Sequence, residues 1–246
     1  MNKVKIEIIK LGESKHSATI KRLRKYVDSN KSKLFEITEI KKVNLPDSDI
    51  YSWGYSDNLL YSLISKTKTN ADIQLGIIDY PIEGNFFGRE LSDSVGIVSF
   101  HETDCIFQEA NIDLLNFLLM TIYQAVVLYS CHKSIKDGQE RLYHDESRGC
   151  IFDMCGLKRS IVTSASNPTI CFSCEAILRQ SALNEKFTLQ LKKELKTIKK
   201  PLYYRIIDWV KTHPILSLLI TVISTVVIGM ITNAIYDIIK YMILGE

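Results

Sequence analysis

Cysteines and a histidine gather in residues 144–174 of this 246-residue chain. Cys171 and Cys174 are separated by two residues, the spacing at which both thiolates of a zinc knuckle bind one tetrahedral ion. The other ligands must come from upstream, where the candidates are His144, Cys150 and Cys155, with Cys105 and Cys131 more remote. The alternative is a set of buried, reduced thiols that pack as small apolar groups. We predict a structural Zn2+ site.

The N-terminus indicates the compartment in which this site forms. The chain begins MNKVKIEIIK, an alternating strand pattern without the apolar core or cleavage site of a signal peptide. We therefore expect a reducing, cytoplasmic environment, where the six cysteines are thiols or metal ligands rather than disulfides. The net charge of +3 is too small to indicate a dedicated nucleic-acid binder.

Several short motifs follow one another in a definite order. Cys150-Ile-Phe comes six residues after His144 and precedes the Cys171/Cys174 pair. Upstream are Leu75-Gly-Ile-Ile-Asp-Tyr, Asn85-Phe-Phe-Gly and Val95-Gly-Ile-Val-Ser-Phe. This order resembles the archaemetzincins, zinc metallopeptidases with the pattern HExxHxxGxxHC, four residues, Cys-x-Met, then Cys-x-x-Cys. The upstream segments resemble the strand, FG turn and edge strand of that family, so the resemblance covers roughly residues 1–180.

The resemblance implies a ligand set but not an activity. In register with His144, the family's first catalytic His falls on Ser134, its general-base Glu on Ile135 and its second His on Gly138. No HExxH occurs in the chain, although such a peptidase needs two His one helical turn apart and a carboxylate to activate water. The family's first structural Cys is replaced by Asp145.

We therefore expect a domain without the family's activity that keeps a structural zinc. The resemblance implies that the ligands are His144, Cys150, Cys171 and Cys174, with Cys155 as the second choice for the fourth ligand.

Other histidine and cysteine residues offer a second catalytic arrangement. His101-Glu102 lies close to Asp104 and Cys105, and His132 lies close to Asp137, so a Cys105/His132 nucleophile pair is conceivable. The alternative is a His at a strand end and another at a helix C-terminus, where its charge is favourable. Because no phosphate-binding glycine loop or nucleophile elbow is present, we expect no enzyme.

The C-terminal part predicts a membrane anchor. Residues 214–236 contain no charged side chain, and about 20 such residues suffice for a helix to cross the hydrocarbon layer. Lys240 alone follows this span, so the excess of basic residues before it predicts a single-pass protein with a cytoplasmic N-terminal domain. The basic residues before the span are Lys192, Lys193, Lys196, Lys199, Lys200, Arg205 and Lys211. Leu202–His213, with Tyr203, Tyr204 and Trp209, predicts a short interfacial helix.

Small and polar residues recur every four positions within the span. They are Ser217, Thr221, Thr225, Gly229 and Asn233. Such a row lets two helices approach closely and predicts self-association. Alternatively, the hydroxyl groups bond back to their own helix.

The remaining segments predict the fold that positions the zinc site. Strand patterns occur at 4–9, 33–43, 73–79 and 95–100, and helical patterns at 19–27, 58–66 and 175–200. The segment 113–131 is apolar almost all round, so it is either a buried central helix or a second span; we interpret it as the helix on which the sheet packs. We expect an α/β class with a mixed sheet, in four regions: a body at 1–180, a helical stalk at 181–213, the span at 214–236 and a tail at 237–246.

The predicted function is that of a membrane-anchored, non-catalytic zinc sensor or effector that perturbs the membrane, as in bacterial defence against phage. The alternatives are a membrane-tethered, metal-dependent hydrolase with a non-standard site and a passive membrane adaptor. The expected partners are the lipid membrane, a second copy of the chain and an unknown cytoplasmic ligand or protein, without nucleic acid.

Overall fold

A computed structural model describes residues 2–51, 53–67, 69–137, 142–145, 149–181, 183 and 185–244. It divides the chain into two compact units, Met1–Lys200 and Pro201–Glu246. The first unit is the body, which contains the predicted metal site. The second unit is the helical C-terminal part.

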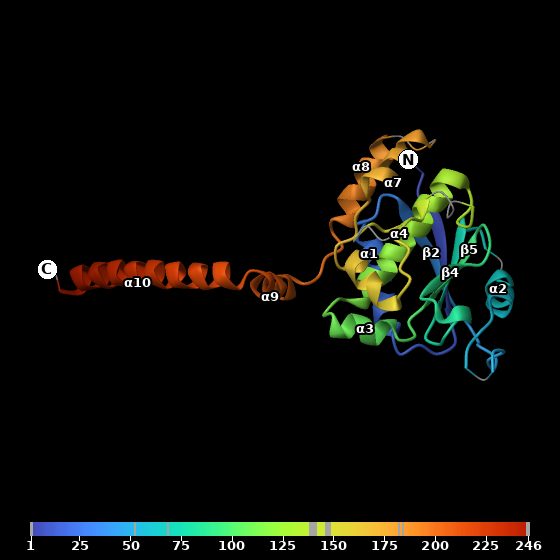
Figure 1. Cartoon of the computed structure of the whole chain (residues 1–246), viewed down its shortest axis with the longest axis horizontal. Coiled ribbons are helices and arrows are strands. Elements are labelled where there is room, and N and C mark those ends of the chain that lie inside the picture. Colours follow the sequence, from blue (N-terminus) through green and yellow to red (C-terminus); the bar gives the residue numbers. More distant parts are fainter. Residues whose placement is uncertain are drawn as a thin grey trace. The chain divides into compact units, whose positions relative to one another are not determined.

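The body is built on a five-stranded sheet in the order β2-β1-β3-β5-β4 (Figure 1). The strands are β1 (Val4–Leu11), β2 (Phe35–Val43), β3 (Ile73–Ile78), β4 (Gly88–Glu90) and β5 (Val95–Ser99). All neighbours are parallel except β4, which is antiparallel to β5. The predicted mixed α/β sheet is confirmed, but the edge is not the strand we expected. Residues 95–100 were predicted as the edge strand, whereas β4 pairs outside β5 and forms this edge.

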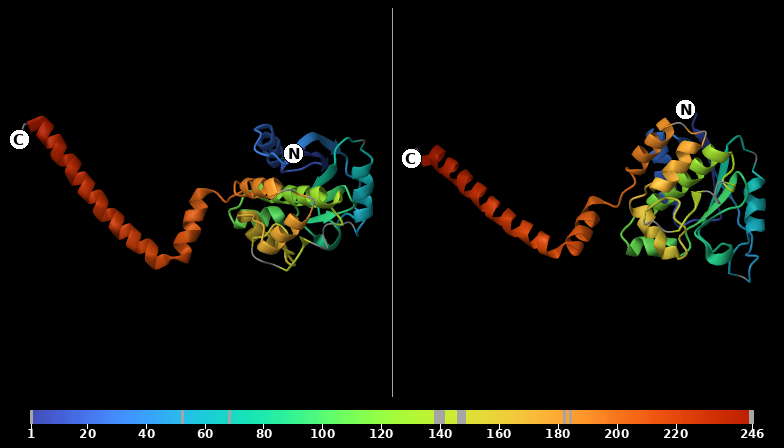
Figure 2. Two further views of the ribbon diagram at one scale, coloured as in Figure 1. Left: turned by 90° about the horizontal axis from the view of Figure 1, so that it is seen from above. Right: turned by 45° about the horizontal axis from the view of Figure 1, so that its top comes forward.

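Helices cover the sheet on both faces (Figures 1 and 2). On one side, α1 (Ser17–Asp28) packs against the long helix α4 (Leu114–His132), and on the other α2 (Asp57–Ser65) packs on β3 and β5. The chain passes from β1 through α1 to β2, and then through α2 to β3 on the opposite side of β1. The point between β1 and β3 is therefore the place where the strand order reverses.

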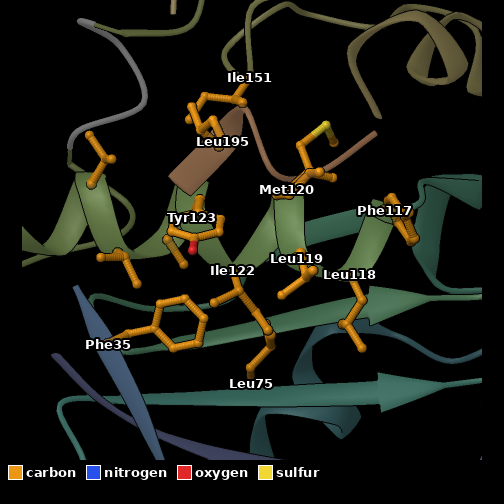
Figure 3. Close-up of a cluster of buried hydrophobic side chains, with 14 of the residues drawn as sticks. Phe35, Leu75, Phe117, Leu118, Leu119, Met120, Ile122, Tyr123, Ile151 and Leu195 are labelled. Atoms are coloured by element: carbon orange, nitrogen blue, oxygen red, sulfur yellow. The ribbon is translucent and has the colours of Figure 1, made fainter. Parts of the chain in front are cut away.

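Helix α4 is the centre of the larger core. Asp113 accepts a hydrogen bond from the Leu115 backbone N–H at its start, and Lys133 ends it in the left-handed conformation. Two-thirds of its most apolar stretch is buried inside the body. Figure 3 shows its side chains packed against residues of several other elements, among them Phe35, Leu75, Ile151 and Leu195. Each such buried side chain contributes about 1.5–3 kcal/mol. The structure thus confirms the central buried helix.

The segment predicted as one helix over 175–200 folds differently. It forms α7 (Phe172–Gln180) and α8 (Glu185–Leu195), and α8 packs into the body instead of forming a stalk from residue 181. The reason is its apolar stripe, whose members Phe187, Leu191, Leu195 and Ile198 are all buried. Glu194 is also buried and accepts hydrogen bonds from Tyr123 and Ser32. Shorter helices complete the body: η1 (Glu83–Asn85), α3 (Thr103–Glu109), η2 (Lys158–Ser160) and α6 (Ile161–Ser166).

The second unit contains α9 (Leu202–Thr212) and α10 (Pro214–Leu244). The predicted break at Pro214 is present, but the helix does not end at residue 236 as expected. Its stretch Pro214–Lys240 is long and apolar enough to cross a membrane, and none of it is buried within the chain. Thr221 and Thr225 donate hydrogen bonds to the carbonyl groups of Ser217 and Thr221, each at 2.9 Å. Their hydroxyl groups are thus satisfied within their own helix.

Candidate metal centre and adjoining pocket

One histidine and three cysteines converge on a single point in the body. The Nε2 or Nδ1 atom of His144 and the sulfurs of Cys150, Cys171 and Cys174 all lie within 4.8 Å of one another. The Cys150 and Cys174 sulfurs are 3.9 Å apart, and His144 Nε2 is 3.3 Å from the Cys171 sulfur. In a tetrahedral zinc site, bond lengths of about 2.1–2.3 Å place two sulfurs about 3.8 Å apart and a sulfur and nitrogen about 3.6 Å apart. The donor set and its spacing fit Zn2+.

The start of α7 positions the closing pair of cysteines. Cys171 is extended and immediately precedes the helix, and its sulfur accepts a hydrogen bond from the Cys174 backbone N–H at 3.4 Å. Cys174 lies in the first turn and is fully buried. A two-residue gap across a helix start therefore turns both sulfurs toward the same point, which is the physical basis of the predicted spacing.

The loop around Cys150 provides the opposite side of the centre. Gly149 has a φ of +134°, a backbone conformation that side-chain-bearing residues rarely adopt. The loop is bound to the strand-like segment before α7, because Ile151 N–H donates to the Thr169 carbonyl at 2.9 Å and Thr169 N–H donates to the Gly149 carbonyl at 2.8 Å. The Cys150 sulfur also accepts from the backbone N–H groups of Phe152 and Cys171, each at 3.5 Å.

Asp153, which was not predicted from the sequence, holds the loop around Cys150 and contacts the His144 ring. Its buried carboxylate accepts hydrogen bonds from the backbone N–H groups of Gly149 at 2.9 Å and Cys150 at 3.1 Å. Its other oxygen lies 3.6 Å from Nδ1 of His144, which also contacts the Asp145 carbonyl at 2.7 Å. A donor bond from Nδ1 to this carbonyl leaves Nε2 free to ligate, as is usual for metal-bound histidine. The sequence feature that could have indicated this role is the position of the Asp153 carboxylate between two candidate ligands, Cys150 and Cys155.

The electrostatics of the buried thiols also favour a cation. A hydrogen bond from the neighbouring Cys174 thiol, helped by two backbone N–H groups, lowers the pKa of Cys150 to about 5. The same hydrogen bond, together with burial, raises the pKa of Cys174. Two adjacent thiolates repel each other, and a divalent cation between them removes the conflict. The pair is therefore suited to bind a metal as two thiolates.

The other candidate zinc ligands and the proposed nucleophile pair lie outside this metal centre. Among the residues that the structure describes, Cys155 is not in the group of ligand atoms, and neither are Cys105 and Cys131. The suggested pair of Cys105 and His132 is separated along the fold, because Cys105 lies in α3 and His132 is the last residue of the 19-residue helix α4. The Cys105 sulfur is instead next to Asp104, whose charge raises the pKa of the thiol.

A pocket of 450 Å³ lies between α4 and the β4–β5 edge of the sheet. The sheet contributes the apolar side chains of Leu75, Ile97 and Val98 to its walls, and α4 contributes Thr121, Gln124 and Ala125. Arg89, Glu90 and Tyr143 are the titratable groups among the described lining residues. The Tyr143 hydroxyl donates to Glu90 at 3.0 Å. On α4, Thr121 donates to carbonyl groups of its own helix and Gln124 donates to the Ile151 carbonyl. The described part of this lining contains no imidazole.

One of the positions on which the family's catalytic residues would fall lines this pocket. Ile135, at the position of the general base, lines it. Ser134, at the position of the first His, follows α4 and donates to Asp93 at 2.8 Å. Gly138, at the position of the second His, lies outside the described residues.

These features define an α/β domain with a mixed sheet, a His/Cys3 centre that can hold zinc, and a C-terminal helix able to span a membrane. No family model and no curated protein matches the chain. Three solved structures are similar in fold. The archaemetzincin from Methanopyrus kandleri has a TM-score of 0.48 at 16% identity, covering 72% of this chain and 94% of its own.

The archaemetzincin from Archaeoglobus fulgidus, complexed with malonate, has a TM-score of 0.41 at 16% identity, covering 70% of this chain and 99% of its own. A zinc-dependent peptidase from Methanocorpusculum labreanum has a TM-score of 0.43 at 14% identity, with the same two coverages. Two of these three structures are archaemetzincins, the family that the motifs resemble.

Proposed function

We propose that this chain is a membrane-anchored zinc protein without catalytic activity, whose cytoplasmic body senses a ligand or a protein partner. The observation that supports it is that none of the four metal ligands is among the described residues that line the adjoining pocket. Four protein ligands complete a tetrahedral site and leave no position for a reactive water. The pocket, in turn, has Ile135 where a general base would be required.

In this proposal the zinc is structural and is held by His144, Cys150, Cys171 and Cys174. It joins α7 to the loop that contains Cys150, two parts of the body otherwise connected by a few backbone hydrogen bonds. Structural zinc contributes about 10–16 kcal/mol in small zinc domains, which is as large as the whole stability of a typical domain, about 5–15 kcal/mol. Folding of this part of the body should therefore depend on the metal.

The membrane part of the proposal rests on α9 and α10. The basic residues before α10 and the single Lys240 within its last turns favour a cytoplasmic body. Leu202, Ile206 and Trp209 are exposed on α9, as an interfacial helix requires. We further propose that α10 self-associates through its row of small residues and perturbs the membrane when the body is triggered, a mode of action suited to bacterial defence against phage.

Metal analysis of the full chain in detergent tests the first part. We expect one zinc per chain, and loss of both the metal and the folded body in Cys174→Ser. The matched control is Cys105→Ser, which changes an exposed cysteine outside the centre and should keep the metal. No peptidase activity should be detected. If instead the chain cleaves peptides, and removal of zinc abolishes cleavage with the fold intact, the chain is a membrane-tethered hydrolase.

Dye leakage from liposomes tests the membrane part. The full chain should release dye, and the chain without residues 214–244 should not. Absence of leakage, with the chain stably inserted and its partner present, would identify a passive adaptor.

A further inference from the structure

Exposed lysines from two distant segments lie side by side on the body. One segment is the loop between α1 and β2, and the other is the last turn of α8 with the residues that follow it. Their side chains are exposed, and within the described ranges none of their ammonium groups is paired with a carboxylate. We call these residues the lysine face: Lys31, Lys33, Lys193, Lys196 and Lys199.

Hydrogen bonds and a ring contact hold the two segments together. The buried carboxylate of Glu194 in α8 accepts a hydrogen bond from the Lys33 backbone N–H at 2.7 Å, although the two residues are 161 positions apart in the chain. The hydroxyl groups of Tyr26 and Thr197 are 3.4 Å apart, and the Lys31 ammonium lies 5.6 Å from the centre of the Tyr26 ring. The lysines of one segment are thus fixed next to those of the other.

The packing of α8 leaves this face with its positive charge. The apolar stripe of α8 is buried in the body, so the members of the lysine face that lie between its residues are turned toward solvent. The nearby acidic side chains have other partners, since Glu175 pairs with Lys192 and Asp28 pairs with Arg24. The Glu194 carboxylate is buried and satisfied by hydrogen bonds. The face therefore attracts an anionic surface.

The chemistry of the side chains favours a diffuse layer of charge over a single bound anion. All five are lysines, whose ammonium groups are hydrated point charges on flexible stems. Arginine would be expected where one phosphate or carboxylate is bound by a planar pair of donors. Lipid headgroups are numerous and mobile, so each lysine can find its own partner, and basic segments bind anionic membranes in this way.

Once α10 is inserted, the chain after the body keeps this face close to the bilayer. Lys200 and Pro201 alone separate Lys199 from α9, and His213 alone separates α9 from α10. With about 1.5 Å per helical residue and at most about 3.6 Å per extended residue, Lys199 stays within roughly 35 Å of Pro214. This limit follows from the covalent chain and holds for any arrangement of the two units. A surface tethered so closely meets the membrane at a high effective concentration.

We propose that the lysine face docks the body on anionic lipid headgroups of the membrane in which α10 is anchored. The inference rests on the proposed membrane anchoring and extends it, because the span alone would leave the body free on its tether. Each lysine close to an anionic surface strengthens binding about fivefold, and salt weakens the attraction. Docking should therefore depend on lipid charge and on ionic strength.

Lysine labelling of the full chain in lipid nanodiscs tests the proposal. The nanodiscs contain phosphatidylcholine alone or mixed with phosphatidylserine, and the inserted chain is treated briefly with an amine-reactive acetylating ester. Mass spectrometry then gives the rate of modification at each lysine. With phosphatidylserine, the lysine face should react at least about fivefold more slowly, and high salt should restore the rate. Lys66 and Lys136, which are exposed after α2 and α4, should react equally in both lipids.

A pair of charge reversals with a matched control locates the contact. Lys193→Glu combined with Lys196→Glu should return the rates at the other three lysines of the face to those found in phosphatidylcholine. Lys66→Glu combined with Lys136→Glu changes the net charge equally and should keep the protection. Equal rates in the two lipids, or protection that the control pair also removes, would overturn the proposal. Protection by added RNA but not by phosphatidylserine would overturn it as well and assign the face to nucleic acid.

Extraction with alkaline carbonate reads the anchoring separately. A chain that is released refutes the anchoring and the docking with it, whereas an anchored chain with equal labelling rates refutes the docking alone. Zinc content should be the same in all of these variants, because the lysine face shares no residue with the metal centre.

Discussion

The buried contact between Tyr123 and Glu194 gives the sharpest test of the unexpected place of α8. The Tyr123 hydroxyl donates to Glu194 at 2.7 Å, and both side chains are almost completely buried. Burial and the nearby carboxylate raise the pKa of Tyr123, so the phenol remains a proton donor throughout the physiological range. Tyr123→Phe removes one donor from a buried carboxylate and leaves the bonds to Glu194 from Ser32, Gln190 and the Lys33 backbone in place.

A hydrogen bond to a charged group contributes about 1.5–3 kcal/mol, so Tyr123→Phe should lower the free energy of unfolding by that amount. For a body of this size, each kcal/mol corresponds to about 2–4 °C, which predicts a Tm roughly 3–12 °C lower. Unfolding of the zinc-loaded full chain in detergent, followed by circular dichroism, measures it. The matched control on the same helix is Tyr129→Phe, whose half-buried hydroxyl lies 3.3 Å from Asp72 and should contribute about 0.5–1 kcal/mol.

A double-mutant cycle separates this contact from general packing. In a Glu194→Ala background the phenol has lost its carboxylate acceptor, so Tyr123→Phe should have little further effect. Equal losses for Tyr123→Phe and Tyr129→Phe, or an unchanged loss in the Glu194→Ala background, would refute the placement of α8 in the body.

Three further predictions concern charge, metal and membrane. Burial opposes ionisation of Glu7, but hydrogen bonds from Lys41 and Gln74 lower its pKa below the ordinary 4.5. The contribution of ionised Glu7 to the free energy of unfolding is therefore complete above pH 4.5 and is lost as the pH falls below that value. Glu7→Gln should accordingly lose less stability on acidification than the natural chain. Asp153→Asn should weaken zinc binding about 10–100-fold in competition with a chelator, because it loosens the hold on His144 and the Cys150 loop; unchanged affinity would contradict that role. The full chain should resist extraction from membranes with alkaline carbonate, and a C-terminal reporter should lie across the membrane from the body; release into the soluble fraction would exclude the span.

Short-range spacing explains which parts were predictable. Cys171 and Cys174 are separated by one helical turn, so their sulfurs converge whatever the rest of the body does. Helix α4 is long and apolar enough for a span, but Thr121 and Gln124 within its apolar run already favoured a buried helix in the sequence. These predictions depend on residues that are neighbours in the sequence.

Two errors have the opposite origin. The strand β4 has three residues, too few to give a pattern, and is defined only by its pairing with β5. The stalk was predicted because residues 181–213 lie between the body and the span. The apolar side chains of residues 187–198 are instead buried in the body, and the buried Glu194 is stabilised there by hydrogen bonds from Tyr123 and Ser32.

By itself, the sequence determined the Cys171/Cys174 pair, the central helix and an apolar segment long enough for a membrane, since each is encoded in local spacing and hydropathy. The choice of His144 and Cys150 as the other ligands came from the archaemetzincin resemblance. The tertiary structure alone decided that Asp153 supports the centre and that α8 belongs to the body. It alone brought Lys31 and Lys33 beside the lysines at the end of α8. Those residues belong to segments far apart in the chain, and only the packing of α8 against the loop before β2 places them on the same side of the body.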